Sequence, residues 1–107
     1  MSKRAGGNTP RSLTSQEALG ALRLALTVST VDFSRKHFRE RMQERGFDMN
    51  DVTHVAKEGT IRRPPEFDIK FCNWKYTVEG RDVEGETLGI VFSVEDGLVT
   101  LITGIRP

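Results

Sequence analysis

The stretch TLGIVFSVEDGLVTLITGI, residues 87–105, determines the fold class of this chain. Apolar side chains recur at every second position on both sides of Asp96-Gly97, a dipeptide typical of two-residue β-hairpin turns. The stretch predicts two antiparallel strands, Thr87–Glu95 and Leu98–Ile105. Because a two-residue turn sets the register, one face of this hairpin should collect the following residues: Leu88, Ile90, Phe92, Val94, Val99, Leu101, Thr103 and Ile105.

Thr103 is the only polar side chain on that predicted face, where it should lie opposite Ile90. It is either an ordinary strand residue with a bonded hydroxyl or a polar group at the edge of a site. Alternation over Asn73–Glu79 predicts a third strand. We expect an edge strand to begin over Thr60–Arg63, to break at Pro64-Pro65 and to resume over Phe67–Phe71.

The part of the chain before residue 59 is helical in pattern. Apolar residues at helical spacing predict helices over residues 15–27, 35–45 and 51–57. The expected caps are Thr14 or Ser15, then Asp32-Phe33-Ser34, then Asp48 or Asn50, with Gly46 and Gly59 ending the second and third helices. This order predicts an α+β fold, with two to three helices packed on one face of a three- to four-stranded antiparallel sheet.

Length and composition narrow the class of protein. A chain of 107 residues and 12.0 kDa is one domain, which we expect to span residues 13–107 after a disordered tail over residues 1–12. No apolar run approaches the ~20 residues of a membrane span, and the start of the chain has no secretory apolar core. Cys72 is the single cysteine and cannot form an internal disulfide, so we expect a cytoplasmic protein.

The net charge of +1 conceals an asymmetry along the chain. Residues 1–47 contain nine Lys/Arg and four Asp/Glu, whereas residues 48–107 contain seven and eleven. The basic half suits an anionic partner such as nucleic acid, but it is equally typical of a solvated helix face.

The helix over residues 35–45 carries the strongest chemical signal. His37, Arg41 and Arg45 recur at four-residue steps, which advance about 40° around a helix, so they form one ridge beside the apolar stripe. An imidazole can transfer a proton near neutral pH, and guanidinium groups match phosphate oxygens. The alternative is that these side chains only extend along the border of the apolar stripe.

Other candidate residues are weaker. The spacing of His37, His54 and Cys72 does not fit a zinc site, so we expect no metal. Ser34 fits a helix cap better than a nucleophile. Trp74 and Tyr76 are typical of core or interface residues, although both side chains can also stack on a base.

Several segments together resemble the family called domain of unknown function 4258 (DUF4258). They are His37–Phe47, Asp51-Val52, Glu58–Ile61, Tyr76–Gly80, Gly85–Leu88, Ile90–Phe92 and Leu101–Thr103, and the resemblance covers about residues 34–105. It implies kinship with the RelE/BrnT-like toxins, a group of small metal-independent ribonucleases in which helices precede an antiparallel sheet. It also implies a polar cluster made of His37, Arg41, Arg45, Tyr76 and Thr103, with no cofactor.

The function expected from this resemblance is RNA cleavage of the bacterial toxin type, by attack of the ribose 2′-hydroxyl on the adjacent phosphorus. His37 would act as general base or acid, Arg41 and Arg45 would hold the phosphate, and Tyr76 and Thr103 would orient or donate protons. The alternative is a non-catalytic protein- or RNA-binding module on the same fold. Expected partners are RNA, a cognate antitoxin or another protein, or a second copy bound through the helix over residues 15–27.

One geometric expectation connects the sheet to the ridge. If Val78 lies opposite Leu88, then Tyr76 lies opposite Ile90, and Tyr76 and Thr103 share the face that the helices cover. His37 or Arg41 should then lie beside one of them.

Overall fold

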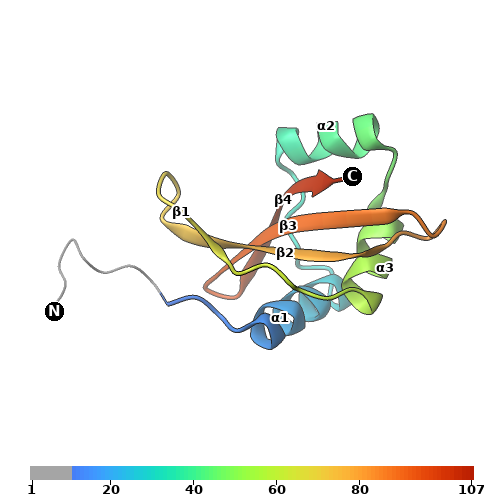
Figure 1. Cartoon of the computed structure of the whole chain (residues 1–107). Coiled ribbons are helices and arrows are strands. Elements are labelled where there is room, and N and C mark those ends of the chain that lie inside the picture. Colours follow the sequence, from blue (N-terminus) through green and yellow to red (C-terminus); the bar gives the residue numbers. More distant parts are fainter. Residues whose placement is uncertain (1–10) are drawn as a thin grey trace, which may run out of the picture.

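The computed structural model describes residues 11–107 of the chain (Figure 1). The elements follow one another as α1 (Ser15–Thr27), α2 (Lys36–Arg45), α3 (Met49–Glu58), β1 (Glu66–Asp68), β2 (Asn73–Arg81), β3 (Thr87–Glu95) and β4 (Leu98–Ile105). Most of the tail expected over residues 1–12 lies outside the described residues.

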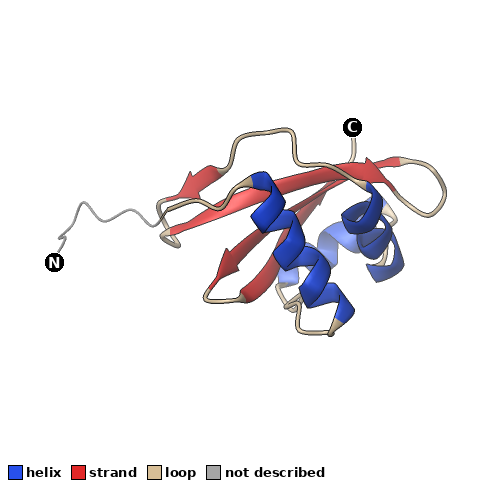
Figure 2. Cartoon of the chain, turned by 90° about the horizontal axis from the view of Figure 1, so that it is seen from below, coloured by secondary structure: helices blue, strands red, loops and turns tan. Residues whose placement is uncertain are grey.

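The four strands form one antiparallel sheet in the order β1-β2-β3-β4. Helices α1 and α3 cover one face of this sheet, as the view from below shows (Figure 2). Helix α2 packs on β4 and lies on the other side of the strands from α1 in both views. The α+β fold class is therefore confirmed, with α2 placed beside the edge of the sheet rather than on the same face as α1 and α3.

The core lies between the sheet and the helices. Its fully buried side chains come from every helix and from β2, β3 and β4, and the largest are Phe38, Phe92, Leu22, Leu88, Ile90 and Leu101. Helix α1 contributes Ala18, Leu22 and Ala25, so it packs on the core of its own chain.

Two of the three helix starts follow local signals. Thr14 and Glu17 form a capping box at α1, and Asp48 and Asp51 form another at α3. The expectation that residues 32–34 cap α2 is wrong. Arg35 occupies the N-cap position without a side-chain bond, while the Ser34 amide and hydroxyl both donate to Asp32 Oδ1, at 2.9 and 2.7 Å.

The edge strand is shorter than expected. The predicted strand over Phe67–Phe71 is observed as β1 (Glu66–Asp68), and residues 69–72 form a turn in which Cys72 has φ +55°. Thr60 makes only an isolated bridge to Glu79. Pro64 and Pro65 lack the amide hydrogen that a strand donates, which explains why Thr60–Arg63 does not extend into β1.

The β3–β4 register follows the predicted pairing only near the turn. Val94 lies opposite Val99 and Phe92 opposite Leu101, but a β-bulge then shifts β4 by one residue. Thr103 consequently lies opposite Val91 rather than Ile90, and Gly104 takes the place opposite Ile90. The expectation that Ile105 shares a face with Leu88 is also wrong, because Ile105 lies opposite Gly89.

The Phe47 ring explains this shift. It packs against Gly104, and a Cβ atom at that position would fall on the ring. A threonine side chain does not fit at the position opposite Ile90. Glycine therefore occupies this position, and Thr103 lies on the opposite face of β4.

The β2–β3 register differs from the expectation by two residues. Tyr76 lies opposite Phe92 and Val78 opposite Ile90. A shift of two preserves the face, so Tyr76 is buried on the helix-covered side, as expected.

Candidate functional site

The ridge on α2 is present, and its three side chains have different surroundings. His37 is exposed in the first turn of the helix. Arg41 is mostly buried, with 23% of its side chain exposed, and forms an ion pair with Glu44. Arg45 donates to the Gly104 carbonyl at the end of β4. Arg45 therefore anchors the helix to the sheet, while His37 remains accessible.

Tyr76 is not brought to this ridge. Its ring packs in the core, with its centroid 5.7 Å from that of Phe92, and its hydroxyl accepts a hydrogen bond of 2.9 Å from the Leu13 amide. Tyr76 therefore ties the segment before α1 to β2, and the expected meeting of Tyr76 with Thr103 does not occur.

Thr103 instead belongs to the face turned away from α1 and α3, which we call the outer face. Strand alternation and pairing place there the residues Lys75, Thr77, Glu79, Gly89, Val91, Ser93, Thr100, Thr103 and Ile105. Arg45 bonds the residue next to Thr103, and α2 lies on this side of the strands (Figure 1). Thr103 therefore does not lie on the face we predicted, and Arg45 is the ridge residue that bonds its neighbour in the chain.

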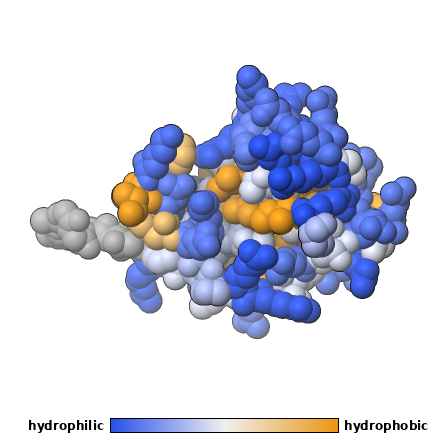
Figure 3. Space-filling view, turned by 45° about the horizontal axis from the view of Figure 1, so that its top comes forward, coloured by the Kyte–Doolittle hydropathy of each residue, from blue (hydrophilic) through white to orange (hydrophobic). Residues whose placement is uncertain are grey.

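Arg35 and Phe71, which are far apart in the sequence, contact each other. Arg35 is the N-cap of α2, and Phe71 lies in the turn between the edge strand β1 and β2. The Arg35 guanidinium carbon is 5.0 Å from the Phe71 ring centroid. Figure 3, which turns the α2 side forward, shows a strip of apolar side chains bordered by hydrophilic ones.

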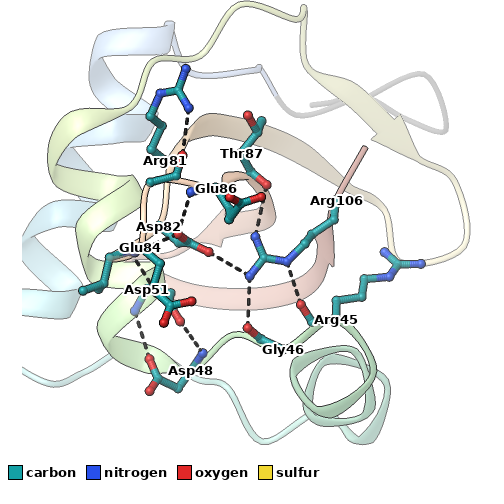
Figure 4. A network of polar contacts seen from close by, with 12 residues as sticks. Arg45, Gly46, Asp48, Asp51, Arg81, Asp82, Glu84, Glu86, Thr87 and Arg106 are labelled. Atoms are coloured by element: carbon teal, nitrogen blue, oxygen red, sulfur yellow. Dashed lines mark hydrogen bonds and ion pairs between the residues drawn. The ribbon is translucent and has the colours of Figure 1, made fainter.

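A network centred on Arg106 holds α2 in place (Figure 4). Its guanidinium donates to the carbonyls of Arg45 at 2.6 Å, Gly46 at 3.0 Å and Thr87 at 3.2 Å. It also forms a 2.8 Å ion pair with Asp82. Sequence reasoning missed Arg106 because its carbonyl partners lie 19 to 61 positions away, so no local pattern marks it.

The two carboxylates with perturbed pKa values belong to turns near α2. Burial raises the pKa of Asp82, but hydrogen bonds from the Glu86 amide, Arg106 and the Glu84 amide outweigh it, so the pKa is lowered overall. The Ser34 hydroxyl and amide hold the pKa of Asp32 below its usual value. Both residues are ionised at neutral pH and act as structural acceptors.

The other two residues considered as metal ligands or nucleophiles, His54 and Cys72, are not part of a site. His54 Nδ1 lies 2.7 Å from the Arg81 carbonyl and ties α3 to the end of β2. Cys72 is a free thiol on the surface. Within residues 11–107, no three His, Cys, Asp or Glu side chains gather as a metal site would require, and no helix is long and apolar enough to cross a bilayer.

Comparison with known proteins adds one finding. The model of a family described as a domain of unknown function matches residues 34–106. No curated protein and no solved structure matches the chain. The match begins just before α2 and includes α2, α3 and the whole sheet, whereas α1 lies outside it.

Proposed function

Because the chain belongs to the DUF4258 family, whose function is unknown, we propose its activity from the site itself: metal-independent endoribonuclease activity of the bacterial toxin type. The RelE-like kinship suggested by the sequence is part of this proposal. We place the activity in the cytoplasm, where the single thiol of Cys72 stays reduced.

The observation that carries the proposal is the position of Thr103. The β-bulge turns this hydroxyl to the outer face, and the next residue, Gly104, accepts a hydrogen bond from Arg45 of α2, the helix that also carries His37 and Arg41. A proton-transfer group and a guanidinium on α2 and a hydroxyl on β4, the strand that α2 contacts, are the groups that RNA transesterification needs. The first turn of α2 also lacks a side-chain cap, so its amides are available to a phosphate.

In the proposed reaction, neutral His37 takes the proton of a ribose 2′-hydroxyl. The 2′-oxygen bonds to the adjacent phosphorus, and the bond from phosphorus to the 5′-oxygen breaks. The imidazolium of His37 or a water molecule then protonates this 5′-oxygen, which leaves a 2′,3′-cyclic phosphate and a 5′-hydroxyl. Arg41 stabilises the charge that develops on the phosphoryl oxygens.

The roles of the other residues are revised accordingly. Arg45 positions α2 through the Gly104 carbonyl, and Thr103 orients the RNA on the outer face. Tyr76 takes no part, because its hydroxyl is occupied by the Leu13 amide inside the core.

The proposal is tested with purified protein and single-stranded RNA in the presence of EDTA. Wild type should produce 2′,3′-cyclic phosphate ends, and His37→Ala should abolish them. His54→Ala is the matched control, since it removes the only other histidine and should retain cleavage. Absence of cleavage by wild type, or equal cleavage by wild type and His37→Ala, would exclude the proposal.

A second candidate function is a non-catalytic RNA-binding module. It is favoured by the burial of Tyr76, which leaves His37 without the second proton donor that the sequence suggested. RNA binding without any cleavage in the same assay would favour this candidate.

A further inference from the structure

The turn between β1 and β2 exposes two large apolar side chains. Ile69 is 87% exposed and Phe71 is 50% exposed, in the turn that connects the strands of the packed pair Phe67 and Trp74. Apolar side chains that lie together in water usually mark a contact surface.

This turn is held in one shape. The Phe71 amide donates to Asp68 Oδ1 at 3.2 Å, and Lys75 lies 3.8 Å from the same carboxylate. Cys72 then takes the left-handed conformation, with φ +55°, that returns the chain into β2. The Phe71 ring is therefore preorganised rather than carried on a loose loop.

Two cations lie against the ring. The Arg35 guanidinium carbon is 5.0 Å and the Lys70 amine nitrogen 5.5 Å from its centroid. Arg35 is also the N-cap of α2, so the ring lies beside the helix end that carries His37 in its first turn.

We propose that Phe71 is a base-stacking residue, which binds one nucleobase of single-stranded RNA while Arg35 and Lys70 bind its backbone phosphates. This inference rests on the proposed function and adds to it the form of the substrate. A half-exposed ring with two cations over it complements an aromatic base joined to an anionic backbone, which can bind those cations while the base stacks on the ring. In a duplex both faces of each base are already covered, so stacking on Phe71 selects unpaired RNA.

An apolar protein surface is a poorer match to this turn. Its apolar area is bordered by Arg35 and Lys70, which an apolar partner would have to desolvate. An RNA strand satisfies the ring and both cations at once.

The experiment measures binding apart from cleavage, using a fluorescent 2′-O-methyl oligonucleotide, which lacks the attacking hydroxyl. Anisotropy titrations compare wild type with Phe71→Leu, which keeps an apolar side chain but removes the ring, and with Phe71→Tyr, which keeps the ring. Val83→Ala is the control, because Val83 is 60% exposed in the β2–β3 loop, away from this turn.

We expect Phe71→Leu to weaken binding roughly 5- to 150-fold, the range typical of losing one stacked base. Phe71→Tyr and Val83→Ala should bind like wild type, and a duplex of the same sequence should bind wild type and Phe71→Leu equally. Equal single-strand binding by wild type and Phe71→Leu, or no binding by wild type, would overturn the inference.

The outcome is separable from that of the proposed function. If His37→Ala binds the analogue normally and wild type cleaves no RNA, ribonuclease activity fails while the stacking role of Phe71 stands. If wild type cleaves RNA but Phe71→Leu binds the analogue as well as wild type, the stacking role fails alone.

Discussion

The guanidinium of Arg106 lies 2.8 Å from the carboxylate of the buried residue Asp82 and joins the last residues of the chain to the β2–β3 loop. The same guanidinium bonds the carbonyls of Arg45 and Gly46, where α2 ends. One side chain thus sets the position of α2 relative to the sheet, and with it the position of the candidate site.

Arg106→Met should destabilise the fold, because it removes the cation that faces the Asp82 carboxylate and the donor that bonds three carbonyls. We expect the Tm to fall by at least about 4 °C in thermal unfolding followed by circular dichroism. Arg62→Met, at an exposed position, should leave the Tm unchanged. Equal Tm values for the two variants would show that the network is dispensable.

Acid should weaken the fold through the same carboxylate. The pKa of Asp82 lies below its ordinary value of 3.8 in the folded state, so the unfolded chain binds more protons around that pH. The stabilisation is complete above the unfolded pKa and is lost as the pH falls through the folded pKa. Urea midpoints should therefore drop between about pH 5 and pH 2, and Asp82→Asn should flatten this dependence. An unchanged slope in Asp82→Asn would contradict the assignment.

Gly104→Ala should disturb the bulged part of β4, since the new methyl group would fall on the Phe47 ring. We expect the free energy of unfolding to decrease by about 1–3 kcal/mol in denaturant titrations. Gly20→Ala is a matched control with open space around it inside α1, and it should stabilise the protein by roughly 0.5–1 kcal/mol. A neutral Gly104→Ala variant would mean that Phe47 does not enforce the register.

Helix α1 lies outside the family match, yet it should be integral to the fold. Leu22 is fully buried, so Leu22→Ala should cost about 2–5 kcal/mol of stability. Leu24 is 64% exposed on the same helix, and Leu24→Ala should change stability by less than about 0.5 kcal/mol. Similar chemical-denaturation midpoints for the two variants would show that α1 is a detachable addition.

Arg41→Ala should lower the rate of RNA cleavage about 10²- to 10³-fold, as expected for the loss of one donor that stabilises a transition state. Arg41→Lys should restore only part of the rate, because an ammonium lacks the forked donors of a guanidinium. Arg39→Ala, which removes an exposed cation from another side of α2, should retain the wild-type rate in the same gel assay.

Local signals predicted most of the secondary structure. Three of these signals are the capping box of Thr14 and Glu17, the left-handed Gly46 and the Asp96-Gly97 turn. Each acts over a few residues, so the helix or strand ends that they set can be predicted without tertiary contacts. Strand alternation likewise placed Tyr76 on the buried face, even with the β2–β3 register displaced by two residues.

Contacts between distant segments decided the rest. The face of Thr103 depends on the Phe47 ring entering the slot at Gly104, and the position of α2 depends on Arg106, whose partners lie far along the chain. Neither contact produces a periodic pattern in the sequence from which it could be predicted. The sequence alone therefore suggested His37, Arg41 and Thr103 as candidates, but the face of the sheet that Thr103 occupies was decided by packing, because a single bulge reverses the face of every residue after it.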